Sequence, residues 1–210
     1  MTHSHAHTPH TTFRRQWTTF IAALTGACLA LLPPGLYAHE VAPPPVPNNI
    51  QVPGGNKAFL EGHAIGTQNY ICLPSGSDFA WILFGPQATL FDDSDKQVTT
   101  HFLSPNPDED DVPRPVWQHS KDTSGVWAMA VASSSDPNFV APGAIPWLLL
   151  EVVGAQDGST GSDKLSETTF IQRLNTSGGV MPSDGCALPT DVGKKAFVPY
   201  TADYFFYEAD

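Results

Sequence analysis

The residues best suited to chemistry are two histidines and a tryptophan in the middle of the chain. His101 lies between Thr100 and Phe102, and Trp117 precedes His119 by two positions. On one strand Trp117 and His119 would share a face, because successive side chains of a strand alternate. An aromatic wall beside imidazoles predicts a site for a small molecule, a polysaccharide or a metal. The simpler interpretation is that each histidine is buried or at a sheet edge, with its ring hydrogen-bonded to the backbone.

Arg173 is a lone cation in a strand-like run. Its planar guanidinium could bind an anionic ligand through two parallel hydrogen bonds. The alternative partner is a carboxylate such as Asp203, which would make Arg173 purely structural. The predicted ligand site therefore has four residues, His101, Trp117, His119 and Arg173. No catalytic residue is assigned, and the cofactor and any metal stay open.

Two further metal sites are conceivable. The acidic runs 92–95 and 108–111 could supply carboxylate oxygens to calcium, although runs of like charge are more often solvated. If the chain is cut after Ala38, the amine and ring of His39 could chelate copper, but only a proline-rich segment follows it. Signatures of common enzymes, namely GxSxG, HExxH, the P-loop and the EF-hand, do not occur in the sequence.

The first 38 residues have the three parts of an export signal. Residues 1–15 are polar and end in Arg14 and Arg15, residues 17–32 are apolar, and Ala38 supplies a small residue at the cut. The apolar run is too short to span a bilayer. The sequence therefore predicts a signal peptide over 1–38, a secreted or periplasmic protein, and no membrane-spanning segment.

Cleavage would leave 172 residues, a length that suits one domain with a full core. The cut removes two of the 10 basic residues and none of the 21 acidic ones, so the net charge falls from −11 to −13. So acidic a chain repels phosphate backbones, which excludes nucleic acid as a partner. The oligomeric state is not predicted.

Two cysteines remain after cleavage, Cys72 and Cys186. An even pair in an oxidising compartment most simply forms one disulfide. The sequence has no CxxC pair or Cys/His cluster that would suggest a metal instead. We predict a Cys72–Cys186 bond that ties the strand 67–73 to the loop before the closing strand.

The elements that must position these residues are short strands. Residues 39–49 are a proline-rich leader, lying over the surface or hanging free, and 50–210 form an all-β domain. In the last run, Val198, Tyr200, Ala202, Tyr204 and Phe206 share the inner face. Ten strand-like runs alternate with turn formers: 58–63, 67–73, 78–84, 88–92, 97–102, 115–119, 126–132, 146–153, 168–174 and 197–207. The pattern predicts a single-domain antiparallel β-sandwich or closed β-barrel with about ten short strands.

Several segments together resemble one known family. They include GTQNYIC (66–72), PVWQHSKDTSG (115–125), FIQRLNTSGGVMPSDGC (170–186) and VPYTADYFFY (198–207). Along roughly residues 50–207 the chain resembles the domain-of-unknown-function 3455 family of exported bacterial and fungal proteins. The resemblance implies secretion and an all-β domain, and it implies no particular activity.

Two functions of different classes fit the sequence. The first is an exported, non-enzymatic structural or binding module at the cell envelope or outside the cell, favoured because the sequence has no nucleophile–base motif. The alternative is a metal-dependent or hydrolytic extracellular enzyme whose site uses His101, His119 and Arg173. A pocket with converging polar groups would favour the enzyme, and a flat surface would favour the module.

Overall fold

The computed structural model describes residues 41–159 and 161–210. The predicted signal peptide and His39 lie outside the described residues. The described strands are β1 (Asn56–Ser75), β2 (Asp78–Phe91), β3 (Gln97–Asn106), β4 (Val112–His119), β5 (Gly125–Ser134), β6 (Trp147–Gln156), β7 (Thr168–Gly178) and β8 (Lys195–Ala209). Three short 3-10 helices accompany them, η1 (Asn48–Ile50), η2 (Pro107–Glu109) and η3 (Pro189–Asp191). Among these residues there is no helix long and apolar enough to cross a membrane.

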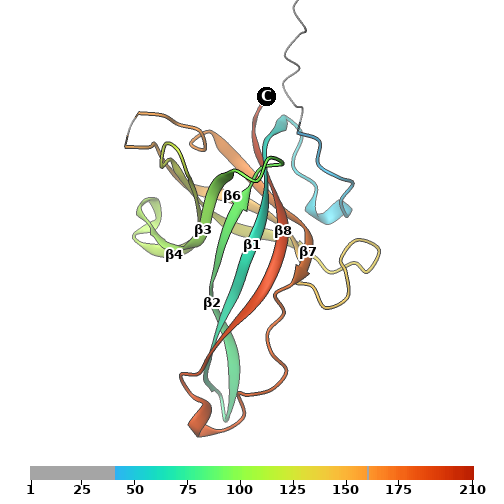
Figure 1. Ribbon diagram of the computed structural model, residues 1–210, viewed down its shortest axis with the longest axis vertical. Coiled ribbons are helices and arrows are strands. Elements are labelled where there is room, and N and C mark those ends of the chain that lie inside the picture. The colour runs from blue at the N-terminus through green and yellow to red at the C-terminus, as the bar shows by residue number, and fades with distance from the viewer. Residues whose placement is uncertain (1–40, 160) are drawn as a thin grey trace, which may run out of the picture. The chain divides into compact units, whose positions relative to one another are not determined.

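The strands form a closed antiparallel barrel (Figure 1). Each strand pairs with its neighbours in the sequence, and β8 returns to pair with β1 from Asn56↔Ala209 to Ile71↔Lys195. The barrel confirms the predicted all-β class, and of the two predicted architectures it is the closed barrel that forms. The sheet closes at β1, which pairs with β2 along one edge and with β8 along the other.

The strands number eight rather than about ten because two pairs of predicted runs are continuous. Runs 58–63 and 67–73 both belong to β1, and runs 78–84 and 88–92 both belong to β2. Gly66, between the first two runs, pairs with Ala88 and Tyr200 within the sheet. A Cβ on Gly66 would lie 2.2 Å from the carbonyl oxygen of Gln87. Gly66 therefore allows a close approach of two strands and does not form a turn.

Alternate residues of β8 point into the barrel, as the period-two pattern predicts. Tyr200, Ala202, Tyr204 and Phe206 are all buried in what we call the interior cluster. Six other strands contribute to the interior cluster through Ala64, Ala88, Leu90, Trp117, Val126, Ala128, Leu150 and Ile171. This cluster is the main core of the barrel.

A second apolar cluster covers the outer face of β6, β7 and β8. Its buried members, here called the outer cluster, are Ile50, Val140, Trp147, Leu149, Leu174, Phe205 and Tyr207. The described part of the leader lies over the surface here, because Val41 and Val46 pack against the outer cluster. Ile50 is 0% exposed, and its carbonyl oxygen accepts a hydrogen bond of 2.6 Å from Nε2 of Gln172. The chain before β1 therefore completes the packing of β7 and β8.

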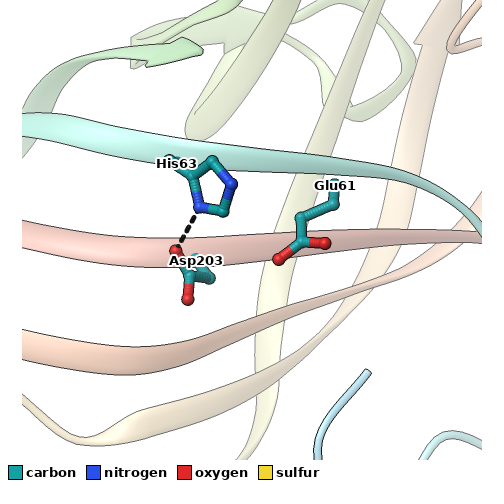
Figure 2. Close-up of side chains that lie close together, drawn as sticks. All are labelled: Glu61, His63 and Asp203. Atoms are coloured by element: carbon teal, nitrogen blue, oxygen red, sulfur yellow. Dashed lines mark hydrogen bonds and ion pairs between the residues drawn. The ribbon is translucent and has the colours of Figure 1, made fainter. Parts of the chain in front are cut away.

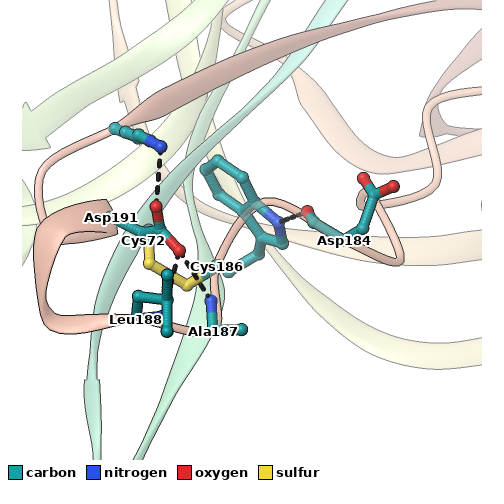
Figure 3. Close-up of a disulfide and its surroundings, with 8 residues drawn as sticks. Cys72, Asp184, Cys186, Ala187, Leu188 and Asp191 are labelled. Atoms are coloured by element: carbon teal, nitrogen blue, oxygen red, sulfur yellow. Dashed lines mark hydrogen bonds and ion pairs between the residues drawn. A yellow bond between two sulfur atoms is a disulfide. The ribbon is translucent and has the colours of Figure 1, made fainter.

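The β1–β2 hairpin is tied to the connection between β7 and β8 (Figure 3). Cys72 on β1 and Cys186 in that connection form a disulfide with Cα atoms 5.5 Å apart, which confirms the predicted bond and its place. The indole N–H of Trp81 on β2 also donates to the carbonyl oxygen of Asp184, at 2.8 Å. The hairpin and the connection thus lie side by side, as Figure 1 also shows.

The shortest ladder of the barrel is the one between β4 and β5. Their ladder has three pairs, from Val116↔Trp127 to Gln118↔Gly125. Before Val116, β4 contains Pro113 and Pro115, which have no N–H to donate to a neighbouring strand. Beyond Trp127, β5 pairs with β6 alone. One end of the barrel interior is therefore bordered by two strands that do not pair with each other there.

Candidate ligand-binding site

A pocket of about 360 Å³ lies where β4 and β5 separate. One side of the pocket is formed by Pro113 and Pro115 of β4, and the other by Met129 and Ala130 of β5. Its inner wall carries five side chains with polar atoms, Gln68, His101, Trp117, Arg173 and Tyr204. Three of these, His101, Trp117 and Arg173, belong to the four residues that the sequence predicts for a ligand site.

Strand register brings these five side chains together. His101 on β3 is the Cα partner of Trp117 on β4, and Arg173 on β7 is the partner of Tyr204 on β8. Partners in an antiparallel ladder lie on the same face, so each pair projects to the same side of the wall. Gln68 on β1 is two positions from Gly66 and shares its face. Residues separated by more than 130 positions thereby meet around one space.

His101 is buried and neutral. Its ring stacks on that of Trp117, with centroids 4.0 Å apart and planes 13° from parallel, and Tyr204 packs against both rings. Burial lowers the pKa of His101 to about 3, so the ring is uncharged at neutral pH. Its Nδ1 lies 2.9 Å from the carbonyl oxygen of Val116. Because a carbonyl can only accept, Nδ1 carries the proton and Nε2 is left as an acceptor.

Arg173 has no carboxylate partner within the described residues. Its Nη2 donates to the carbonyl oxygen of Pro146 at 2.8 Å. Asp203, the alternative partner considered from the sequence, does not pair with it. The carboxylate of Asp203 instead binds His63 and Asn175, because Asp203 and Tyr204 are adjacent on β8 and point to opposite faces. The guanidinium of Arg173 therefore brings an unpaired positive charge to the pocket wall.

Buried donors without a protein partner are concentrated in this pocket. Among the described residues, seven buried side-chain polar atoms lack a hydrogen-bond partner. Three of the seven belong to the pocket wall, Nε2 of Gln68, Nε1 of Trp117 and Nε of Arg173. All three are N–H donors. Buried donors are costly to leave unpaired, so a ligand that brings acceptors here would be stabilised.

Two of the five polar residues of the inner wall, Gln68 and Tyr204, lie outside the predicted set. For Tyr204 a signal exists, since it lies on the inner face of the closing strand in the period-two pattern. Gln68 has a weaker signal, a polar residue at an inward position between Gly66 and Tyr70. Neither pattern says which inward residues face each other, because that depends on the pairing of distant strands.

His119, the fourth predicted residue, is not in this pocket. Its Nδ1 is 2.9 Å from Oδ1 of Asp122, and the same carboxylate accepts hydrogen bonds from the backbone and hydroxyl of Ser124 and from the backbone of Lys164. His119 therefore helps to organise the turn between β4 and β5. It lies on the same strand and face as Trp117, as the spacing predicts, but two positions further along β4, toward the opposite end of the barrel interior.

A second cluster of ionisable side chains surrounds His63 on β1. No sequence pattern indicates this cluster. Nδ1 of His63 lies 2.7 Å from Asp203 (Figure 2). Its Nε2 lies 3.0 Å from Asp93. Hydrogen bonds to Asp203 and then Asp93 raise the pKa of His63 to about 9, so the ring is an imidazolium at neutral pH. Glu61, His63 and Asp203 could also offer metal ligands within 4.8 Å of one another. A metal would have to displace one of the two ring protons, each of which is hydrogen-bonded to a carboxylate.

The two acidic runs proposed for calcium have other contacts in the structure. Oδ1 of Asp92 accepts the backbone N–H groups of Ser94 and Lys96 and closes the turn between β2 and β3. In the second run, Glu109 binds Arg114 through two hydrogen bonds of 2.9 and 2.8 Å. In the part of the chain that is described, the one group of three possible metal ligands is that around His63, outside both runs.

A larger groove of about 970 Å³ lies along β1, β2 and β3. Its lining includes exposed apolar side chains such as Ile65, Leu103 and Phe197, and apart from His101 it has no ionisable side chain. None of its lining side chains carries a buried atom without a partner. The smaller pocket is therefore the better candidate for binding a specific ligand, since it has oriented polar groups in an apolar wall.

A family model described as "Protein of unknown function (DUF3455)" matches residues 53–208. No curated protein and no solved structure matches the chain.

Proposed function

The chain belongs to the DUF3455 family, whose function is unknown, and from that premise we propose that it is an exported, non-enzymatic module that binds a small ligand in the barrel pocket. The observation that carries this proposal is the set of unpartnered buried donors on Gln68, Trp117 and Arg173 around one space. The rest of the wall supports it, since Met129, Leu148 and Leu150 provide an apolar surface, as in most ligand pockets.

Binding is favoured over catalysis by the chemistry of the wall. A pocket with converging polar groups is the feature expected of an enzyme, but a hydrolase also needs a nucleophile or a base. Of the residues that line the pocket, none is Ser, Thr, Cys, Asp or Glu. His101 is a poor general base, because burial lowers its pKa to about 3, far below the working pH of most enzymes. These groups can hold and orient a ligand.

Export is supported by the bond between Cys72 and Cys186. Disulfides persist in oxidising compartments and are rare in the cytosol. The predicted signal over residues 1–38 leads to the same compartment. A small ligand outside the cytoplasm is therefore the partner we propose, with a secreted or periplasmic location.

A pocket-filling variant tests the binding site. We expect a panel of neutral and charged organic molecules to include compounds that shift backbone amide NMR signals of the pocket wall. Ala130→Trp places a large side chain at the pocket mouth and should weaken such binding by about 10-fold or more. Ala209→Trp, at the exposed end of β8, is the matched control and should leave binding unchanged. Binding that survives Ala130→Trp would locate the site elsewhere, and conversion of a panel compound would favour the enzyme.

A further inference from the structure

We propose that the ligand of the barrel pocket is a small organic monoanion, a carboxylate on an apolar body, whose charge is paired with Arg173. This inference rests on the proposed function and adds the chemical class of the ligand. Two cations, Arg114 and Arg173, line the pocket, and the lining has no acidic side chain, although the whole chain has 21 acidic and 10 basic residues.

The two arginines differ in whether their charge is already paired. Arg114 binds Glu109 through both carboxylate oxygens, at 2.8 and 2.9 Å, so its charge is neutralised at the pocket mouth. Arg173 has no ion pair with any described residue, and its Nε is buried without a partner. The neutral ring of His101 adds no charge. The wall therefore carries one uncompensated positive charge, which matches a ligand with a single negative charge.

The unpartnered donors specify an acceptor-rich ligand. Gln68 is 3% exposed and Trp117 is 1% exposed, and each has a buried N–H without a protein partner. A carboxylate offers two oxygens and about four acceptor positions, and it has no donor that would compete with these groups. A neutral hydroxyl or amide could satisfy one donor, but it would leave the charge of Arg173 unpaired.

The apolar part of the wall indicates an organic anion instead of an inorganic one. Met129, Leu148 and Leu150 line the same space. Inorganic phosphate or sulfate would leave this surface without contacts and would bring a second charge that Arg173 alone does not balance. A carboxylate with an aromatic or aliphatic body satisfies both parts of the pocket, since the volume of about 360 Å³ is in the range of small-molecule sites.

Three carboxylates and their primary amides provide the test: benzoate, phenylacetate and hexanoate, each titrated into the purified full chain with amide NMR shifts as the readout. Each amide keeps the shape of its acid and removes the charge. We expect at least one carboxylate to bind in the pocket about 10-fold or more tightly than its amide, because hydrogen bonds to charged groups are the stronger class. Inorganic sulfate at the same concentration should bind more weakly than that carboxylate.

Variants test whether Arg173 causes the preference for a carboxylate over its amide. Arg173→Gln should abolish the difference between acid and amide. Lys57→Gln is the control for net charge, because it also removes one cation but lies in an exposed pair with Glu208, and it should keep the preference within about 2-fold. If Arg173→Gln does not fold, Gln68→Leu replaces an unpartnered donor by an apolar group and should weaken the carboxylate by several-fold while the protein stays folded.

The outcomes separate the inference from the proposed function. Amides that bind in the pocket as tightly as their acids would overturn the anionic ligand and leave the binding module standing. If Arg173→Gln and Gln68→Leu both keep the preference for the acid, this wall of the pocket does not cause that preference. Such a result would overturn the assignment of the preference to the wall. Carboxylates that cause no shift in pocket residues would also overturn the inference, and failure of the whole compound panel would overturn the proposed function with it.

Discussion

At the scale of single residues, this protein places two histidines in opposite electrostatic environments. His101 is enclosed by rings inside the barrel, and burial lowers its pKa to about 3. His63 lies on the other face of the sheet between two carboxylates, and Asp203 and Asp93 raise its pKa to about 9. The same side chain is therefore neutral in one place and charged in the other at pH 7. The difference follows from which face of its strand each residue occupies.

The raised pKa of His63 predicts a pH-dependent contribution to stability. The folded state holds the proton more tightly than an unfolded chain, whose histidine pKa is about 6.5. The stabilisation is therefore complete below about pH 6.5 and is lost as the pH rises through about 9. Because the side chain is 40% exposed, the effect is small. We expect His63→Gln to lower the thermal midpoint at pH 6 by on the order of 2 °C.

The same comparison at pH 9.5 is the control for the His63 prediction. Most wild-type rings have then lost the proton, so the thermal midpoints of wild type and His63→Gln should converge. A difference between the two proteins that stays constant from pH 6 to 9.5 would show that His63 stabilises the fold by packing alone.

At the scale of elements, the continuity of β1 determines whether the sheet closes. β1 pairs with β2 along one edge and with β8 along the other, and Gly66 lies in the middle of both ladders. At this position the backbone of β2 approaches so closely that a Cβ on Gly66 would meet Gln87 at 2.2 Å and Ala88 at 2.5 Å. A side chain here would have to move the backbone of β2.

Gly66→Ala should therefore destabilise the barrel. We expect a loss of about 1–3 kcal/mol or more in the free energy of unfolding, because the added methyl meets backbone atoms that cannot rotate away. Gly54→Ala is the matched control, since a Cβ there has no atom within 4 Å, and it should change stability by less than about 0.5 kcal/mol. Chemical denaturation measures both values. Equal effects of the two substitutions would contradict the close approach.

At the scale of the whole molecule, one covalent bond joins segments that are far apart in the chain. Cys72 and Cys186 are separated by 114 positions, and their bond holds the β1–β2 hairpin to the connection before β8. On the chain-entropy model so long a loop contributes roughly 4–5 kcal/mol, an upper figure. The net stability of a typical domain is about 5–15 kcal/mol, so this bond could supply a large part of the free energy of unfolding.

Removal of the disulfide should lower stability and preserve the fold. For the double variant Cys72→Ala with Cys186→Ala we expect a thermal midpoint lower by roughly 5–15 °C with a β-type circular dichroism spectrum. The interior cluster does not depend on the bond, so the barrel should still form. Alkylation of both cysteines in the native, unreduced protein, located by peptide mapping, would show that the bond does not form.

Patterns that are local in the chain could be predicted from the sequence. The period-two alternation indicates an all-β protein and places Tyr200, Ala202, Tyr204 and Phe206 on the inner face, because side-chain direction depends only on position along a strand. Cys72 and Cys186 could be paired because no other cysteine remains after the predicted cleavage.

The tertiary structure alone decided which of these elements meet. Strand pairing makes Gly66 a point of contact with Ala88, where the sequence suggests a break, and closes the sheet into a barrel. It places Arg173 beside Tyr204 and Asp203 beside His63, and it keeps His119 away from the pocket. The physical reason is that register depends on hydrogen bonds between residues far apart in the chain, and a shift of one residue exchanges the faces of a strand.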